Sequence, residues 1–299
     1  MPAASPGLET VTLGGGIVIG VARGLPRVDP AVFDVLLTDV AEPPRPWVNA
    51  TPADLEVGVA RAPGAARVLV DVLRATEGIA VPEALVVESL AYSMLQHGGE
   101  FERWLATEPR REHAEVAEPV LLARSGSRLD VTLARPEVHN AFDTSIRDGL
   151  ISAFELIEAA PEIAEMHLRG LGPSFSSGGD LSEFGLARDP VEAHRVRIER
   201  SVAVRVHDNA QRVTAHLHGS CLGAGIEVPA FAATVLAAPG TAIGLPELSL
   251  GLIPGAGGTV SIPRRIGRHR CAFLALSGRR IDAGTALAWG LVDGIDEAG

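Results

Sequence analysis

Two glutamates stand alone in the most apolar part of the chain. Between residues 213 and 263, Glu227 and Glu247 are the only members of the set aspartate, glutamate, lysine and arginine. A carboxylate in apolar surroundings resists ionisation, so its pKa rises. Such groups suit general acid and base work near neutral pH. Taken singly, each glutamate is better explained as a helix charge or a cap. For the two glutamates together in this apolar setting, a catalytic role is as good an interpretation as a structural one.

Two glycine-rich turns accompany these glutamates. Small residues at 219–226 directly precede Glu227, and small residues that open a helix leave its first backbone N–H groups uncovered. Uncovered N–H groups are what stabilises an oxyanion. The turn Phe175–Asp180 is a candidate for a second donor, although glycines also mark ordinary tight turns. Asp180 is interpreted as a residue that fixes its loop, with ligand contact as the alternative.

Composition argues against several other classes of function. All 26 basic residues are arginine, so the chain has no Schiff-base or P-loop lysine. The net charge of −11 argues against binding of nucleic acid. Cys221 and Cys271 make no disulfide framework, and no Cys/His spacing indicates a metal site. The start of the chain lacks a signal-peptide pattern, and prolines interrupt the apolar run 228–246. We therefore expect a cytoplasmic protein without metal, cofactor or membrane contact.

The elements that position these residues alternate between strand and helix after residue 118. The chain has 299 residues, of which 46% are hydrophobic, enough for one large domain or two ordinary ones. A helix is predicted from Asp143 to Pro161, with an apolar face at Ile146, Leu150 and Phe154. The alternation indicates an α/β fold. Strands are predicted at 120–123, 129–134, 166–168, 213–217 and 234–237, and further helices at 190–208 and 224–231.

The first part of the chain follows a different pattern. A strand is predicted at 17–22, and a mainly helical region follows it. The highly charged segment 110–118 is interpreted as a linker, so we predict an N-terminal extension over 1–118 and a core over 119–299. Apolar side chains that recur at helical spacing are expected to form a buried stripe; they are Val86, Leu90, Met94, Phe101 and Leu105.

Several stretches of the second part resemble the crotonase, or enoyl-CoA hydratase/isomerase, superfamily. The resemblance covers about residues 120–295 and implies a core of stacked β-β-α turns, in which two sheets form a spiral. Members of that family continue for several helices after the last matching stretch, so the C-terminus of this core is expected to be shortened. The matching stretches, in chain order, are Arg135-Pro136 with Asn140-Ala141, Phe175–Asp180, Leu222–Glu227, Leu245–Glu247 with Leu252–Gly258, and Gly290–Asp293.

The resemblance also implies a substrate and a set of site residues. The substrate would be an acyl-CoA thioester, so coenzyme A enters only as part of it, and the enolate would lie between two backbone N–H groups. By residue match these belong to Ser177 and Ala224. Hydratases of the family use two glutamates twenty residues apart, as Glu227 and Glu247 are, and the family forms trimers or hexamers. The other turn residues expected to contact substrate are Ser176, Gly178, Gly179, Asp180 and Gly223.

We therefore expect an enoyl-CoA hydratase or dehydratase, with three alternatives. Two are other enzyme chemistries: isomerisation of a double bond, and cofactor-free oxygenation of an arylacetyl-CoA. The segments Val87–Leu95 and Phe101–Leu105 resemble the helical N-terminal domain of cofactor-free dihydroxyphenylacetyl-CoA dioxygenases. The third alternative is a non-catalytic acyl-CoA-binding partner, against which the glutamate pair argues. We also expect the helices between residues 52 and 104 to pack on the core, with a separately folded accessory domain as the alternative.

Overall fold

Four strands in which alternate residues are buried form the middle of the main sheet. The structure, a computed structural model, describes residues 7–109 and 116–297. Its largest sheet has the strand order β13-β10-β8-β7-β6-β5, in which β5 and β6 are antiparallel and the other neighbours are parallel. The strands are β5 (Val120–Ser125), β6 (Arg128–Leu133), β7 (Glu165–Gly170), β8 (Val213–Leu217), β10 (Thr234–Ala237) and β13 (Gly294–Ile295).

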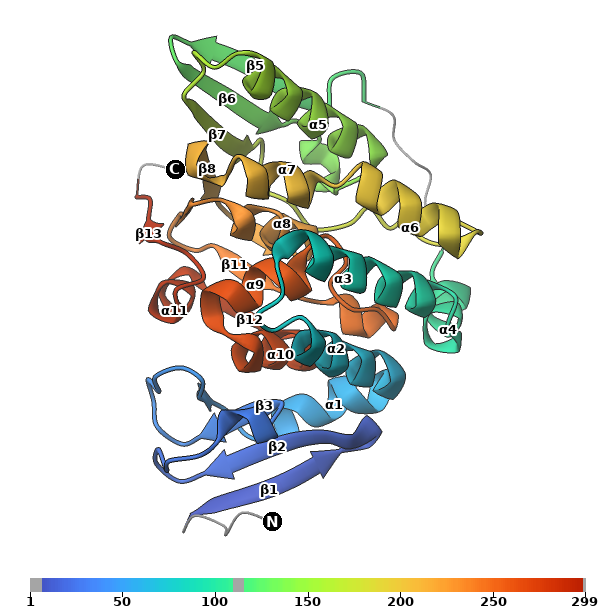
Figure 1. The fold of residues 1–299 in the computed structure, drawn as a ribbon, viewed down its shortest axis with the longest axis vertical. Coiled ribbons are helices and arrows are strands. Elements are labelled where there is room, and N and C mark those ends of the chain that lie inside the picture. The colour runs from blue at the N-terminus through green and yellow to red at the C-terminus, as the bar shows by residue number, and fades with distance from the viewer. Residues whose placement is uncertain (1–6, 110–115, 298–299) are drawn as a thin grey trace.

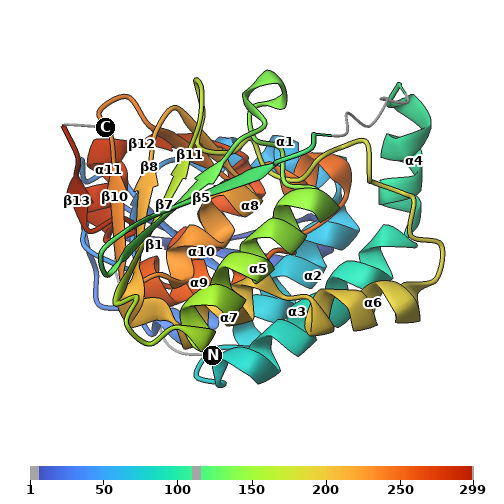
Figure 2. The same ribbon diagram turned by 90° about the horizontal axis from the view of Figure 1, so that it is seen from above.

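Helices connect these strands and lie along one side of the sheet (Figure 2). The predicted helix after Asp143 is confirmed, because Asp143 Oδ1 accepts a hydrogen bond from Ile146 N at 2.8 Å and caps the helix. Its apolar face, which includes Leu150 and Phe154, is buried as expected. These helices are α5 (Thr144–Ala159), α6 (Pro190–Glu199) and α7 (Val202–Asp208).

A smaller sheet brings the two predicted catalytic glutamates together. Its strand order is β12-β11-β9, and β9 and β11 are parallel neighbours. Glu227 ends the short helix that follows β9, and Glu247 opens the 3-10 turn that follows β11. Both glutamates therefore lie beyond the same edge of one sheet. The elements are β9 (Ser220–Leu222), α8 (Ala224–Glu227), β11 (Ala242–Gly244), α9 (Gly258–Ile266), α10 (Arg268–Ser277), β12 (Arg280–Asp282) and α11 (Ala283–Trp289).

The N-terminal region contains a sheet as well as the expected helices. The sheet has the order β1-β2-β3-β4 and lies at the opposite end of the molecule from β5 and β6 (Figure 1). The sequence pattern predicted only β2 of these strands. The elements are β1 (Leu8–Leu13), β2 (Ile17–Ala22), β3 (Val35–Thr38), β4 (Val48–Asn49), α1 (Ala53–Arg61), α2 (Pro63–Ala75), α3 (Val81–Gln96) and α4 (Gly99–Thr107).

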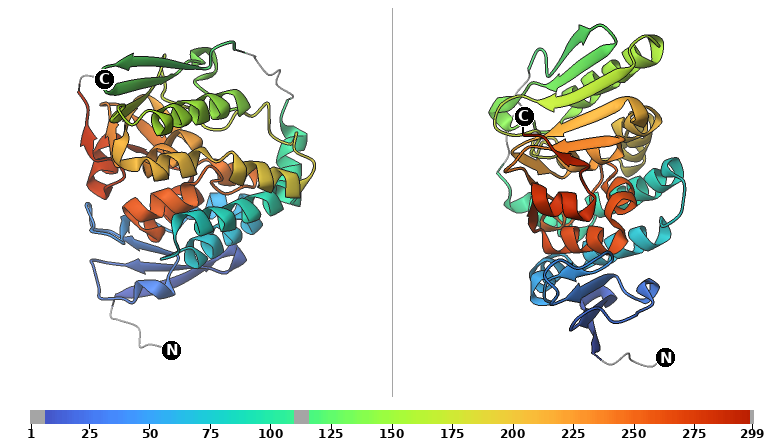
Figure 3. Two further views of the ribbon diagram at one scale, coloured as in Figure 1. Left: turned by 45° about the horizontal axis from the view of Figure 1, so that its top comes forward. Right: turned by 90° about the vertical axis from the view of Figure 1, so that its left-hand side faces the viewer.

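The N-terminal helices pack directly on the core, which confirms that expectation. Helix α1 contacts α10, α2 contacts α9 and α10, and α3 contacts α6 and α9 (Figure 3). One hydrophobic cluster joins the two regions and includes Leu55 and Leu69 together with Val260 and Leu274. Most of the predicted linker, residues 110–115, lies outside the described residues.

The expected buried stripe of α3 and α4 is wrong at four of its five positions. Val86, Leu90 and Met94 are 36%, 53% and 57% exposed, and Leu105 is also exposed, whereas Phe101 is buried. Helix α3 turns a different face toward the core, and this face includes polar side chains. These polar groups hydrogen bond to the core and so can be buried at little cost. The buried residues of α3 are Val81, Ala84, Leu85, Glu88, Ser89, Ser93 and Leu95.

Candidate active site

Glu227 lies inside the core, where a backbone segment surrounds its carboxylate. The residue is 2% exposed. Its Oε2 accepts hydrogen bonds from Ala256 N at 2.8 Å and Gly258 N at 2.9 Å. A Cβ on Gly258 would lie 2.6 Å from Glu227 Cγ, so glycine is required for this close approach. The turn before α9 therefore fixes the position of the carboxylate.

Glu247 approaches the same point from the neighbouring strand. A Cβ on Gly223 would lie 2.2 Å from Glu247 Oε1 and 3.6 Å from Glu227 Oε1. Both carboxyl groups thus face the space that the absent side chain of Gly223 leaves open. Glu247 Oε2 is buried and has no hydrogen-bond partner within residues 7–109 and 116–297.

Burial and mutual repulsion change the proton affinity of this pair. Burial, followed by the charges of Glu247 and Glu88, raises the pKa of Glu227 well above its usual range. Burial also raises the pKa of Glu247 to about 8. Two carboxylates this close cannot both ionise readily, so the pair retains a proton at neutral pH. One member is then able to accept a proton while the other donates one.

A third buried carboxylate, which the sequence reasoning missed, lies on the N-terminal helix α3. Glu88 is 2% exposed and lines the same cavity as the glutamate pair. Its carboxylate accepts hydrogen bonds from Gly257 N at 2.7 Å, Thr259 N at 2.9 Å and Thr259 Oγ1 at 2.7 Å. Glu88 is the only charged residue between Ala84 and Leu95. This isolation is a weaker form of the signal that singled out Glu227 and Glu247.

The prediction that Ser177 offers its backbone N–H to a ligand is wrong. That N–H already donates to His139 O at 2.9 Å, and Ser177 is not among the described residues that line the cavity. Gly179 and Ala224 do line it. Within the described residues, neither of their N–H groups has an acceptor. Gly178 O accepts a hydrogen bond from Phe142 N. The N–H of Gly179 belongs to the same trans peptide and therefore points away from Phe142.

The other predicted substrate contacts support the site from behind the cavity wall. Ser176 Oγ donates to Asn140 O at 2.8 Å, and a Cβ on Gly178 would lie 2.8 Å from Leu222 O. Ser176 therefore ties the turn to residue 140, and Gly178 allows the turn to lie close to β9. Among the described residues that line the cavity, Ser176, Gly178, Asp180 and Gly223 do not occur, so direct substrate contact is not seen for them.

Asp180 fixes its loop, which is the first of the two interpretations given above. The fully buried guanidinium of Arg135 lies 3.1 Å from Asp180 Oδ2 and 2.9 Å from Asp143 Oδ2. Asp180 Oδ1 also accepts from Ser182 Oγ at 2.7 Å. Burial opposes ionisation of Asp180, but these hydrogen bonds and the Arg135 charge outweigh it and lower the pKa of Asp180. The ion-pair network ties the glycine-rich turn to the start of α5.

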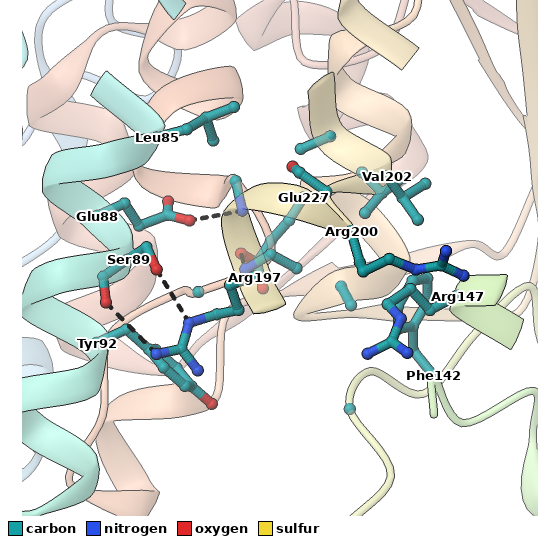
Figure 4. A pocket seen from close by; sticks show the side chains of 18 of the residues that line it. Leu85, Glu88, Ser89, Tyr92, Phe142, Arg147, Arg197, Arg200, Val202 and Glu227 are labelled. Atoms are coloured by element: carbon teal, nitrogen blue, oxygen red, sulfur yellow. Dashed lines mark hydrogen bonds between the residues drawn. The ribbon is translucent and has the colours of Figure 1, made fainter. Parts of the chain in front are cut away.

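The cavity beside the glutamates holds about 270 Å³. Figure 4 shows Glu88, Ser89 and Tyr92 on one side of it and Phe142, Arg147 and Arg200 on the other. Arg197 crosses toward α3, where its guanidinium lies 4.9 Å from the centre of the Tyr92 ring. It donates to Ser89 Oγ at 3.2 Å and to Gln96 Oε1 at 3.1 Å. The N-terminal helix thus supplies one wall of the cavity.

Residues 7–109 and 116–297 contain neither a metal-ligand cluster nor a membrane-spanning helix. No group of three or more histidine, cysteine, aspartate or glutamate side chains is arranged to hold a metal ion. In the same residues, no helix combines the length and the apolar character that a membrane crossing requires.

Comparisons with known proteins agree with this fold. The family described as enoyl-CoA hydratase/isomerase matches residues 124–298. The 2,3-dehydroadipyl-CoA hydratase of Escherichia coli is 30% identical over 59% of this chain and 68% of its own. The mevalonyl-coenzyme A hydratase of Beauveria bassiana is 30% identical over 56% of this chain and 62% of its own. The chain therefore spans about two thirds of the length of these relatives.

A solved structure extends the comparison to three dimensions. The enoyl-CoA hydratase from Thermoplasma volcanium aligns with a TM-score of 0.56 and 32% identity, over 60% of this chain and 73% of that one. The shared fold confirms the predicted α/β core.

Proposed function

Because this chain belongs to the enoyl-CoA hydratase/isomerase family, we propose that it adds water to a 2-enoyl-CoA thioester, or removes water in the reverse direction. The observation that carries the proposal is that Glu227 and Glu247 face one point in a cavity. Two backbone N–H groups that have no acceptor among the described residues, those of Gly179 and Ala224, line the same cavity. Two of the curated relatives are named hydratases, which favours hydration, and two others are named only as hydratase/isomerase.

The proposed reaction uses each of these groups once. The ionised carboxylate of the pair takes a proton from water, and the water oxygen bonds to Cβ of the substrate. The π electrons of the carbon–carbon double bond move toward the thioester, so negative charge collects on its oxygen. The N–H groups of Gly179 and Ala224 donate to that oxygen. A preorganised donor of this kind contributes about 3–4 kcal/mol to the transition state.

The second half of the reaction consumes the proton that the pair retains. The protonated carboxyl delivers its proton to Cα, and the enolate returns to a thioester. The net change is the addition of one water molecule, and the pair ends with the same number of protons as before. General acid and base steps of this type contribute roughly 10²–10⁴-fold to a rate.

A substrate panel tests the proposal. The purified protein is mixed with crotonyl-CoA, with longer enoyl-CoAs and with aryl enoyl-CoAs. We expect the absorbance of the conjugated thioester to fall and the product to gain the mass of one water. A product of unchanged mass with a displaced double bond would show an isomerase instead. Oxygen uptake with an arylacetyl-CoA would indicate the oxygenase alternative, and tight binding without turnover would indicate a binding partner.

A further inference from the structure

One backbone segment, Ala256–Thr259, lies between two buried carboxylates. The N–H groups of Ala256 and Gly258 donate to Glu227. Those of Gly257 and Thr259, which alternate with them, donate to Glu88. Each carboxylate therefore holds the segment in the position that the other requires.

We infer that Glu88 is a positioning residue for the acid pair. It fixes the backbone segment that binds Glu227, and its negative charge helps the pair Glu227 and Glu247 to retain a proton. Glu88 reaches the pair from helix α3, outside the stretch that the family match covers. The inference rests on the proposed hydration only where it is tested by enzyme kinetics. The electrostatic part concerns the resting protein.

The donors around Glu88 do not by themselves account for a charge at this position. Within the described part of the chain, Glu88 accepts three hydrogen bonds, all from neutral groups on Gly257 and Thr259. Burying an ionisable carboxyl costs several kcal/mol. The nearby cation Arg197 is engaged by Ser89, Ser93 and Gln96, and no carboxylate of the described residues accepts a hydrogen bond from it. Besides burial, the charge of Glu88 also acts on Glu227 and Glu247, where it raises the pKa of each carboxyl.

The groups that face Glu227 come from four packed elements. Three buried carboxyls lie on the side of the cavity where Arg197 is the nearby arginine, while Arg147 and Arg200 line the other side, so the carboxyls cannot all be ionised at neutral pH. Burial raises the pKa of Glu88 to about 7, and its charge therefore acts most strongly above that pH. Besides Glu227, the titratable groups are Glu247 in the turn after β11, Glu88 and Tyr92 on α3, Arg197 on α6 and the Cys271 thiol on α10.

The first test replaces Glu88 with an uncharged residue of the same shape. Glu88→Gln removes the negative charge, so Glu227 and Glu247 ionise more easily. We expect the profile of kcat/KM against pH to move toward acid by about one pH unit. The exposed residue Glu83 lies on the same helix, and Glu83→Gln is the matched control, with no expected shift. A Glu88→Gln profile that coincides with the wild-type profile after scaling would overturn the inference, because it would leave only a structural role.

The second test leaves Glu88 in place and changes one of its donors. Thr259→Val removes the hydroxyl that donates to Glu88 Oε2 at nearly constant volume. Glu88 then holds its proton to higher pH, and its charge on the pair falls. We expect a smaller shift of the pH profile in the same direction, while Thr259→Ser, which keeps the hydroxyl, retains the wild-type profile. Equal profiles for both variants would contradict the inference even if Glu88→Gln did not fold.

A third measurement separates this inference from the proposed reaction. Infrared difference spectra of the protein without substrate report neutral carboxylic acids through their carbonyl band. During a pH titration, the last such band should disappear at lower pH in Glu88→Gln than in the wild type. This result is expected even if no enoyl-CoA is turned over. An unchanged titration, with the Glu88 band alone missing, would refute the coupling.

Discussion

Gly223 and Glu247 are so close that no side chain fits between them. A Cβ at position 223 would lie 2.2 Å from Glu247 Oε1, and the backbone of Gly223 has a φ of +48°. Gly223→Ala should therefore displace the Glu247 carboxylate and lower turnover by about a hundredfold or more, the range of a lost acid or base. Steady-state kinetics with an active enoyl-CoA measure this effect.

The control for that substitution separates backbone strain from displacement of the carboxylate. Gly126 has a φ of +61°, and no atom lies within 4 Å of its hypothetical Cβ. Gly126→Ala should introduce comparable left-handed backbone strain without a steric clash, and should leave turnover unchanged. Normal turnover in a folded Gly223→Ala protein would mean that the position of Glu247 does not matter for catalysis.

Amide substitutions test the acid pair itself. Glu227→Gln and Glu247→Gln keep the size of each side chain but remove its proton transfer. Each should lower kcat by about a hundredfold or more, while calorimetry should show little change in affinity for a CoA thioester. The exposed Glu155 on α5 gives the control Glu155→Gln, with unchanged kcat. A variant of the pair with near-normal turnover would remove that carboxylate from the mechanism.

Proline at position 224 removes one predicted oxyanion donor with little harm to the fold. Ala224 is the first residue of α8, a position at which proline suits the helix and the N–H has no intrahelical partner. Ala224→Pro should lower kcat by about 10²–10³-fold, with circular dichroism unchanged. Ala283 is the first residue of α11, and Ala283→Pro is the control. Full activity of a folded Ala224→Pro protein would exclude this N–H as a donor.

The buried arginine behind the site should control stability. Arg135→Gln leaves Asp143 and Asp180 without their shared cation, which should lower the free energy of unfolding by about 3–5 kcal/mol. Urea denaturation measures this loss. The pKa of Asp180 is lower in the folded protein than its usual value of 3.8, so its ion pair stabilises the fold above that pH. The difference between wild type and variant should shrink as the pH falls below this value, and a constant difference would argue against the ion pair.

Expression of residues 119–299 alone tests whether the core needs the N-terminal helices. This fragment lacks Glu88 and Tyr92 and exposes the faces of α9 and α10 that contact α2. We expect an aggregated or inactive fragment, and recovery of activity when residues 1–118 are co-expressed with it. A soluble and fully active fragment would show that these helices are dispensable.

The sequence was informative where chemistry is local and less so where packing decides. The helix after Asp143 follows from a cap and an apolar face, and the lone glutamates 227 and 247 follow from their apolar context. The orientation of α3 does not follow, because Glu88, Ser89 and Ser93 are buried by partners more than a hundred residues away. The availability of an N–H is also non-local: only the fold shows that His139 O occupies that of Ser177.

The position of Glu88 has a practical consequence for engineering. The helix that carries it lies outside residues 124–298, which are those shared with the family. Chimeras that keep this stretch intact and graft α3 with a neutral residue at position 88 would retain every shared residue and still work best at a different pH. Under the proposed role of Glu88, the pH optimum of this protein would be exchangeable as a module, separately from the residues proposed to perform the reaction.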